Sequence, residues 1–189
     1  MTPIEPVVPP VVAGETIVLE AVQARHAHEL AELDWKRGLH PGMAGPLAAA
    51  RTAEVSTLLA RSVATGRVVA VLDAADMLGY PGVRNVSIYA DAASTERGEA
   101  LEAYGRFVLH ELDGGARLIH HEVLELNRPI QRIFAALGLQ ATASLRQHAY
   151  VAGRFWDVLV YAYGRPELDG ILARVFPRGR RGTGPPRGD

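Results

Sequence analysis

A junction between a strand and a helix is the first place in this sequence where chemistry is expected. Residues 86–91 have the pattern of a short strand, and a polar turn at residues 92–98 leads into a helix. Such a junction leaves the first-turn amides without partners and adds the positive end of the helix dipole. The segment therefore predicts a site for a phosphate or similar anion at Thr95-Glu96-Arg97-Gly98-Glu99-Ala100.

Two predicted strands carry candidate acid–base groups. On the first, His120 and Glu122 alternate onto one face and His121 points to the other. An imidazole titrates near neutral pH, so His120 is a candidate base. On the second, His148 and Tyr150 share a face. A strand histidine is also commonly a hydrogen-bonded structural residue, and that alternative stands beside the catalytic one.

Hydrophobic periodicity and turn residues predict the elements that must position these groups. The segment at residues 34–45 is rich in glycine and predicts an irregular loop, and residues 77–83 are too broken for a definite strand. Helices are predicted at residues 23–33, 46–63, 98–113 and 127–137. Strands are predicted at residues 16–22, 67–73, 86–91, 117–123, 141–151 and 155–163.

Local signals define the second half of the chain most sharply. The helix at residues 98–113 has an apolar stripe, with Glu102 and Arg106 forming an i,i+4 pair expected on the solvent side. Asn127 is a good N-cap for the next helix, which ends at Gly138. The tripeptide Ala152-Gly153-Arg154 between two β-rich runs predicts a hairpin.

Composition excludes several classes of protein and site. The chain has 189 residues, enough for one domain with a full core. A formal net charge of −1 argues against broad electrostatic capture of nucleic acid. Without cysteine there is no disulfide, thiolate nucleophile or cysteine-bound zinc, and no metal site is expected. The sequence shows neither a signal peptide nor an apolar run long enough to span a membrane, so a cytoplasmic protein is expected.

Three segments differ in composition. Residues 1–15 contain four prolines and predict an extended leader. Residues 16–168 carry the predicted strands and helices and form the expected folded domain. Residues 169–189 form a C-terminal segment whose Arg/Gly/Pro-rich part beyond about residue 177 has nothing to bury and is expected to be disordered.

The chain resembles the GNAT N-acetyltransferase superfamily in three blocks. Gly98 and Ala100 fit the family's pyrophosphate loop, Gln/Arg-x-x-Gly-x-Gly/Ala. Residues 127–139 are similar to its Asn-x-x-Ala/Ser … Leu-Gly-Phe segment, and residues 146–161 resemble the last hairpin of the ribosomal-protein-alanine acetyltransferase-like branch. The resemblance implies an α/β (α+β) GNAT fold, with a mixed twisted sheet of about six to seven strands, splayed central strands and about four flanking helices.

The resemblance also implies acetyl-CoA as acyl donor, held in the gap between the splayed strands, with its pyrophosphate on the loop amides. The loop at residues 34–45 then forms a wall of the acceptor pocket, with Trp35, His40 and Met43 as substrate-binding candidates, although a plain surface loop is an equal alternative. The implied cofactor-binding residues are Tyr89, Ala90, Asp91, Thr95, Arg97, Gly98, Glu99, Ala100, Asn127, Arg132 and Phe134.

Three positions depart from the family pattern. Thr95 stands where the loop has Gln or Arg, Asn85 where this branch often has a Glu base, and Phe134 where many members have a Tyr that protonates the thiolate. Neither Asn85 nor Phe134 exchanges a proton near pH 7. We prefer the interpretation of Phe134 as an ordinary core aromatic. The remaining catalytic candidates are His120, Glu122, His148 and Tyr150.

The resemblance implies an acyltransferase that moves an acetyl or short acyl group from CoA to a primary amine. The amine belongs either to a protein N-terminus or to a small metabolite. Two alternatives stay open because of the altered positions: a binding or regulatory module that has lost transfer chemistry, and a GNAT scaffold that runs another reaction in a biosynthetic pathway. The oligomeric state does not follow from the sequence.

Overall fold

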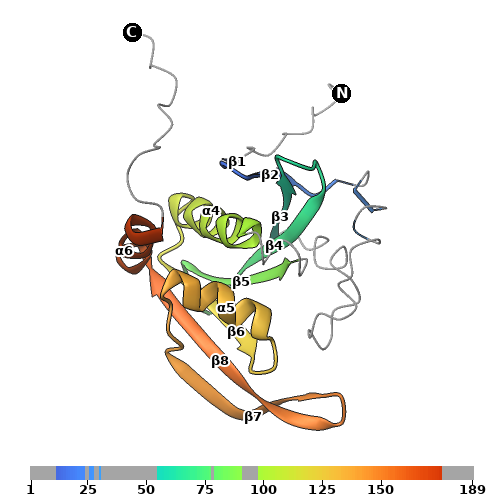
Figure 1. Ribbon diagram of the computed structural model, residues 1–189. Coiled ribbons are helices and arrows are strands. Elements are labelled where there is room, and N and C mark those ends of the chain that lie inside the picture. The colour runs from blue at the N-terminus through green and yellow to red at the C-terminus, as the bar shows by residue number, and fades with distance from the viewer. Residues whose placement is uncertain are drawn as a thin grey trace, which may run out of the picture.

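The computed structural model describes residues 12–23, 26–27, 30, 55–77, 79–90 and 98–175. These residues form one eight-stranded sheet in the order β1-β2-β3-β4-β5-β6-β8-β7, with three helices packed on it (Figure 1). The predicted mixed α/β class is confirmed, with eight strands in place of six to seven. The strands are β1 (Val12–Ala13), β2 (Ile17–Ala21), β3 (Val55–Ser62), β4 (Val68–Asp76), β5 (Val83–Ala90), β6 (Leu118–Leu124), β7 (Ala143–Val151) and β8 (Arg154–Gly164). The helices are α4 (Glu99–Asp113), α5 (Arg128–Leu137) and α6 (Arg165–Val175).

The sheet is mixed because one pair of neighbours is parallel. Strands β5 and β6 run in the same direction and are connected through α4, whereas every other neighbouring pair is antiparallel. Parallel neighbours need a crossover segment, and a helix is the usual one. The crossover lays α4 across one face of the sheet (Figure 1).

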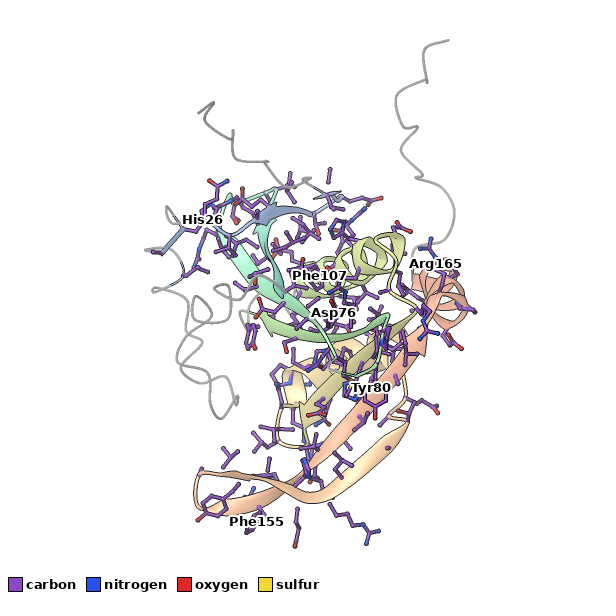
Figure 2. The ribbon with its side chains drawn as sticks, turned by 180° about the vertical axis from the view of Figure 1, so that it is seen from behind. His26, Asp76, Tyr80, Phe107, Phe155 and Arg165 are labelled. Carbon is purple, nitrogen blue, oxygen red and sulfur yellow. The ribbon has the colours of Figure 1, made fainter. Side chains whose placement is uncertain are left out.

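The main core lies between the sheet and α4. Tyr104, Phe107 and Val108 are fully buried, which confirms the predicted apolar stripe, and Figure 2 shows Phe107 on this helix. Alternate strand residues such as Leu72 and Ile88 face the helix. The intervening residues point to the other face, where Leu59, Val71 and Leu30 form a second apolar cluster with Val22, Val68 and Tyr89.

The prediction of a helix at residues 46–63 is wrong for residues 55–63, the part of this segment that the structure describes. Residues 55–62 form β3, which lies between β2 and β4. Leu58 and Leu59 lie next to each other in sequence and enter opposite cores, one on each face of the sheet. A short apolar run of this kind fits a helix or a strand that is buried on both faces, and pairing with neighbours on both sides decides for the strand.

The expected solvent position of Glu102 is also wrong. Its side chain is buried and accepts hydrogen bonds from the backbone N–H groups of Glu15 and Thr16, at 2.6 and 2.9 Å, and from the Thr16 hydroxyl. Arg106 pairs with the same carboxylate at 2.7 Å, as its i,i+4 spacing predicted. The carboxylate therefore fastens the loop before β2 onto α4.

Local signals in the second half are confirmed. Asn127 caps α5 through a hydrogen bond accepted from the N–H of Ile130 at 3.4 Å, and Gly138 ends the helix in the left-handed region. Ala152 and Gly153 both have positive φ and form the turn of the β7–β8 hairpin, as type I′ turns require. Beyond the last β6–β8 pair, at Leu124, the hairpin projects from the body of the protein (Figure 1).

Several predictions fall outside the described residues. They concern the leader before residue 12, most of the helix at residues 23–33, the loop at residues 34–45 with Trp35, His40 and Met43, and the tail after residue 175. Within the described part of the chain, no helix has the length and apolar character needed to cross a membrane.

Candidate functional site

The sheet divides between its two central strands. Strands β5 and β6 pair only from Val83 with Leu118 to Asn85 with His120. After that point β5 stays paired with β4 up to Ala90, and β6 stays paired with β8 up to Leu124. Backbone groups on the facing edges beyond Asn85 and His120 therefore have no ladder partner across the split. Fixed N–H groups of this kind can polarise a carbonyl placed between the strands.

The N-terminus of α4 carries no side-chain cap. The N-cap residue, Gly98, adopts φ 78° and ψ −2° and makes no side-chain capping hydrogen bond. The Glu99 carboxylate is buried and accepts a hydrogen bond from the Ser62 hydroxyl at 2.6 Å. A negative side chain in the first turn is thus directed into the sheet, so the helix terminus remains suited to an external anion. Asp91, Thr95 and Arg97, from the preceding turn, lie outside the described residues.

His120 lies where the sheet begins to split. Its Nδ1 is 3.5 Å from Oδ1 of Asn85, and its Nε2 is 4.0 Å from a carboxylate oxygen of Glu122. The imidazole is 13% exposed, whereas Glu122 is half exposed. His121 points to the other face, as predicted, where its ring contacts those of Tyr104 and Phe134. The geometry brings His120 and Glu122 together and leaves the imidazole in reach of the split.

Asp73 is a candidate site residue that the sequence analysis did not identify. It lies in the middle of β4, directly paired with Thr57 on β3 and Ser87 on β5. Leu72 and Ala74 face α4, so Asp73 points to the face that carries Asn85 and His120. The residue is 7% exposed, and neither carboxylate oxygen has a hydrogen-bond partner among the described residues.

Burial raises the pKa of Asp73 to about 6. The neighbouring Thr57 hydroxyl lowers it by a smaller amount, without reaching hydrogen-bond geometry. The sequence contained one signal for this residue: it ends the run Val-Val-Ala-Val-Leu-Asp, at the last residue of the strand predicted at residues 67–73. The strand instead continues to Asp76, which places the carboxylate inside the sheet.

Tyr89 lies on the same face, two residues along β5 from the Asp73–Ser87 pair, because it pairs with Val71. Its pKa is raised to about 12 by burial and by the negative charge of Asp73, against a smaller lowering by a hydrogen bond with Ser87. The phenol therefore stays protonated at neutral pH. Ala90, the last residue of β5, packs against the main core.

The residues implied for cofactor binding on α5 have separate environments. Phe134 is fully buried, with ring centroids 5.0 Å from Tyr104, 4.8 Å from His121 and 4.5 Å from Tyr161, so it is a core aromatic. The Asn127 side chain caps the helix. Arg132 is exposed and lines an open pocket of about 420 Å³, whose other lining residues are Arg128, Gln131, Ala135, Leu139 and Tyr161.

His148 and Tyr150 lie far from His120. Both are exposed, and Tyr150 pairs with Phe155 near the turn of the projecting hairpin, where Figure 2 labels Phe155. His120 pairs with Ala162 on the same β8 strand. The stretch of β8 from Phe155 to Ala162 spans about 23 Å at about 3.3 Å per residue. The structure thus does not bring these two candidates to the split.

The described residues include no group of three or more His, Asp or Glu side chains placed to hold a metal ion. The polar side chains that share this face of the sheet can act as acids, bases or hydrogen-bonding groups. They comprise Asp73, Ser87, Asn85, His120 and Glu122, which lie on one face of three neighbouring strands.

Comparison with known proteins identifies the fold. No protein-family model matches the chain, and no curated protein matches it. Among solved structures, a GCN5-related N-acetyltransferase from Brucella melitensis is similar at a TM-score of 0.72 and 22% identity, covering 89% of this chain and 86% of that one. RimJ of Mycobacterium smegmatis, solved in complex with CoA-disulfide, is similar at a TM-score of 0.69 and 18% identity. The match covers 88% of this chain and 93% of that one.

A third solved structure comes from the branch that the hairpin block resembles. The ribosomal-protein-S5-alanine acetyltransferase of Vibrio fischeri is similar at a TM-score of 0.68 and 11% identity, covering 82% of this chain and 96% of that one. The chain therefore has the fold of the GNAT N-acetyltransferases.

Proposed function

We propose that the protein is an acyl-CoA-dependent N-acetyltransferase that moves an acetyl or short acyl group to a primary amine. The observation that carries the proposal is the split between β5 and β6 beside the uncapped start of α4. Neighbours with this fold are acetyltransferases, and one was solved with a CoA derivative. The acceptor is a protein N-terminus or a small metabolite, and the cytoplasm is the expected location.

Acetyl-CoA would bind with its pyrophosphate on the first-turn amides of α4, after the turn that holds Thr95 and Arg97. Gly98 suits this role because its φ of 78° needs no side chain and a Cβ there would project into open space, where the phosphate is expected. The hydrogen bond from Ser62 directs the Glu99 carboxylate away from that position. The pantetheine and thioester would then follow the unpaired edge of β5.

The acceptor nitrogen would attack the thioester from the face that carries His120. A free amine attacking a thioester needs mainly deprotonation and correct placement. His120 is the proposed base, since it lies at the split and its ring is partly exposed. Glu122, at 4.0 Å, would orient the ring. Trp35, His40 and Met43 are proposed to contact the rest of the acceptor.

A binding module without transfer chemistry is the second candidate. Two observations favour it: Asn85 cannot titrate, and Phe134 is packed in the core with no exposed surface from which to reach a thiolate. Both candidates predict saturable binding of acetyl-CoA. They differ in whether CoA thiol is released when an amine is supplied.

Calorimetric titration with acetyl-CoA and with free CoA tests the proposal. The parent protein should bind both, and Gly98→Val should abolish binding because a β-branched residue neither adopts this φ nor leaves room for the phosphate. Gly98→Asn is the matched control for backbone strain, since asparagine tolerates the left-handed region. Melting temperatures should be retained with Asn while affinity falls. An unaltered affinity in folded Gly98→Asn protein, or no binding by the parent, would reject the site.

A further inference from the structure

Asp73 differs from the other buried acids of the protein. The described residues contain four acidic side chains that are buried, and three of them are paired: Glu99 with Ser62, Glu102 with Thr16 and Arg106, and Glu111 with Arg84 at 3.5 Å. Both oxygens of Asp73 lack a partner within the part of the chain that the structure describes. An ionised carboxylate removed from water without a partner is costly, so a cation is the natural complement.

The position of Asp73 relates it to the split strands. Asp73 pairs with Ser87, two residues along β5 from Asn85, and Asn85 pairs with His120. From strand spacing and rise, the Cα atoms of Asp73 and His120 are about 12 Å apart. Both side chains point to the same face, and a nitrogen placed between them is within reach of both. That position adjoins the edge of β5 that faces β6.

We propose that Asp73 binds the ammonium group of the acceptor and so restricts the protein to amines that arrive as cations. The inference rests on the proposed function, because it places the nitrogen beside the thioester. A primary ammonium has three N–H donors, enough for both Asp73 oxygens and for His120. Asp73 is thus assigned to substrate binding and His120 to proton transfer.

The reaction then balances without a further reactant. One ammonium proton passes to the His120 imidazole, and the free amine attacks the thioester carbonyl carbon to form the N–C bond. The C–S bond breaks, and the surplus proton on nitrogen goes to the departing sulfur, which leaves as CoA thiol. His120 releases its proton to solvent, and Asp73 remains ionised throughout.

The test follows the carboxyl ¹³C signals of the unliganded protein by NMR while n-butylammonium chloride is added. A saturable change in the Asp73 signal is expected, since its carboxylate is buried and lacks a described partner. Asp76, exposed on the same strand and paired with Arg84 at 3.0 Å, is the internal control and should show no saturation. An Asp73 signal that responds no more than that of Asp76 would overturn the inference.

Two variants sharpen the result. Asp73→Asn should weaken n-butylammonium binding by about 30-fold or more, because one member of a buried charge pair is lost. Asp76→Asn should leave it unchanged. Equal affinity in Asp73→Asn and the parent would also overturn the inference. Calorimetry with acetyl-CoA separates the two claims: no CoA binding with a responsive Asp73 rejects the proposed function alone, and CoA binding with an unresponsive Asp73 rejects this inference alone.

Discussion

Replacing Asp73 with Asn should stabilise the protein at neutral pH while removing the proposed amine site. The carboxyl pKa rises from 3.8 to about 6 when the chain folds, because the group is buried. Each unit of change in the pKa corresponds to about 1.4 kcal/mol of free energy. The ionised carboxylate therefore lowers the free energy of unfolding by at most about 3 kcal/mol above pH 6. Asparagine has nearly the same shape and no charge, so the variant avoids this cost.

The sign of the pH dependence follows from proton binding. Below pH 3.8 Asp73 is protonated in both states and imposes no cost. Between pH 3.8 and about 6 the unfolded chain has lost the proton that the folded chain keeps, so the free energy of unfolding falls as pH rises. The described polar groups facing Asp73 are Thr57, Ser87 and Tyr89, none of which ionises in this range.

Urea denaturation from about pH 4 to about pH 7 measures the effect, with unfolding free energies compared between parent and Asp73→Asn at each pH. The difference should grow by up to about 3 kcal/mol in favour of the variant as pH rises. Asp76→Asn, which alters an exposed ion pair, should differ from the parent by less than about 1 kcal/mol throughout. If the difference in unfolding free energy stays constant with pH, the Asp73 carboxylate has a partner in solution. The inference that both of its oxygens lack a hydrogen-bond partner would then be wrong.

Three further outcomes are expected. His120→Ala should lower kcat for any accepted amine by about 10²–10⁴-fold with little change in acetyl-CoA affinity, and full kcat in a steady-state assay would remove His120 as the base. Glu102→Gln should lower the free energy of unfolding by about 1.5–3 kcal/mol at pH 7, by loss of charge-assisted hydrogen bonds. Burial raises the Glu102 pKa, but hydrogen bonds from Thr16, Arg106 and the Glu15 and Thr16 amides lower it more. The difference in unfolding free energy between the parent and Glu102→Gln should therefore shrink below pH 4.5, and a difference that grows there would refute the prediction. Phe134→Ala should cost about 3–5 kcal/mol by leaving a cavity among three rings, and a thermal melt that matches the parent would contradict its core position.

Elements defined by neighbouring residues could be predicted from the sequence. The boundaries of α4 and α5 depend on Gly98, Asn127 and Gly138, and the hairpin on Ala152-Gly153, all of which act within a few residues. Caps and turns satisfy backbone groups or permit positive φ at the same place in the chain, so their effect needs no distant partner. The three blocks that resemble the GNAT superfamily are built on these local elements.

Elements defined by distant neighbours could not be predicted with the same accuracy. The run that includes Leu58 and Leu59 becomes β3 because β2 and β4 pair with it on both sides. The same pairing carries β4 past Asp73, where the predicted strand ends, to Asp76 and so buries the Asp73 carboxylate. Burial of Glu102 depends likewise on a loop that lies far from it in sequence.

By itself the sequence determined which residues are able to titrate and which of them share a face of a strand. The first property depends on side-chain chemistry, and the second depends on the alternation of successive side chains between the two faces of a strand. Only the tertiary structure decided which of them meet. It brought Asp73 and His120 to one face beside the split and left His148 and Tyr150 on a projecting hairpin. The physical reason is that strand register is set by hydrogen bonding and burial between segments distant in sequence, and no local pattern encodes it.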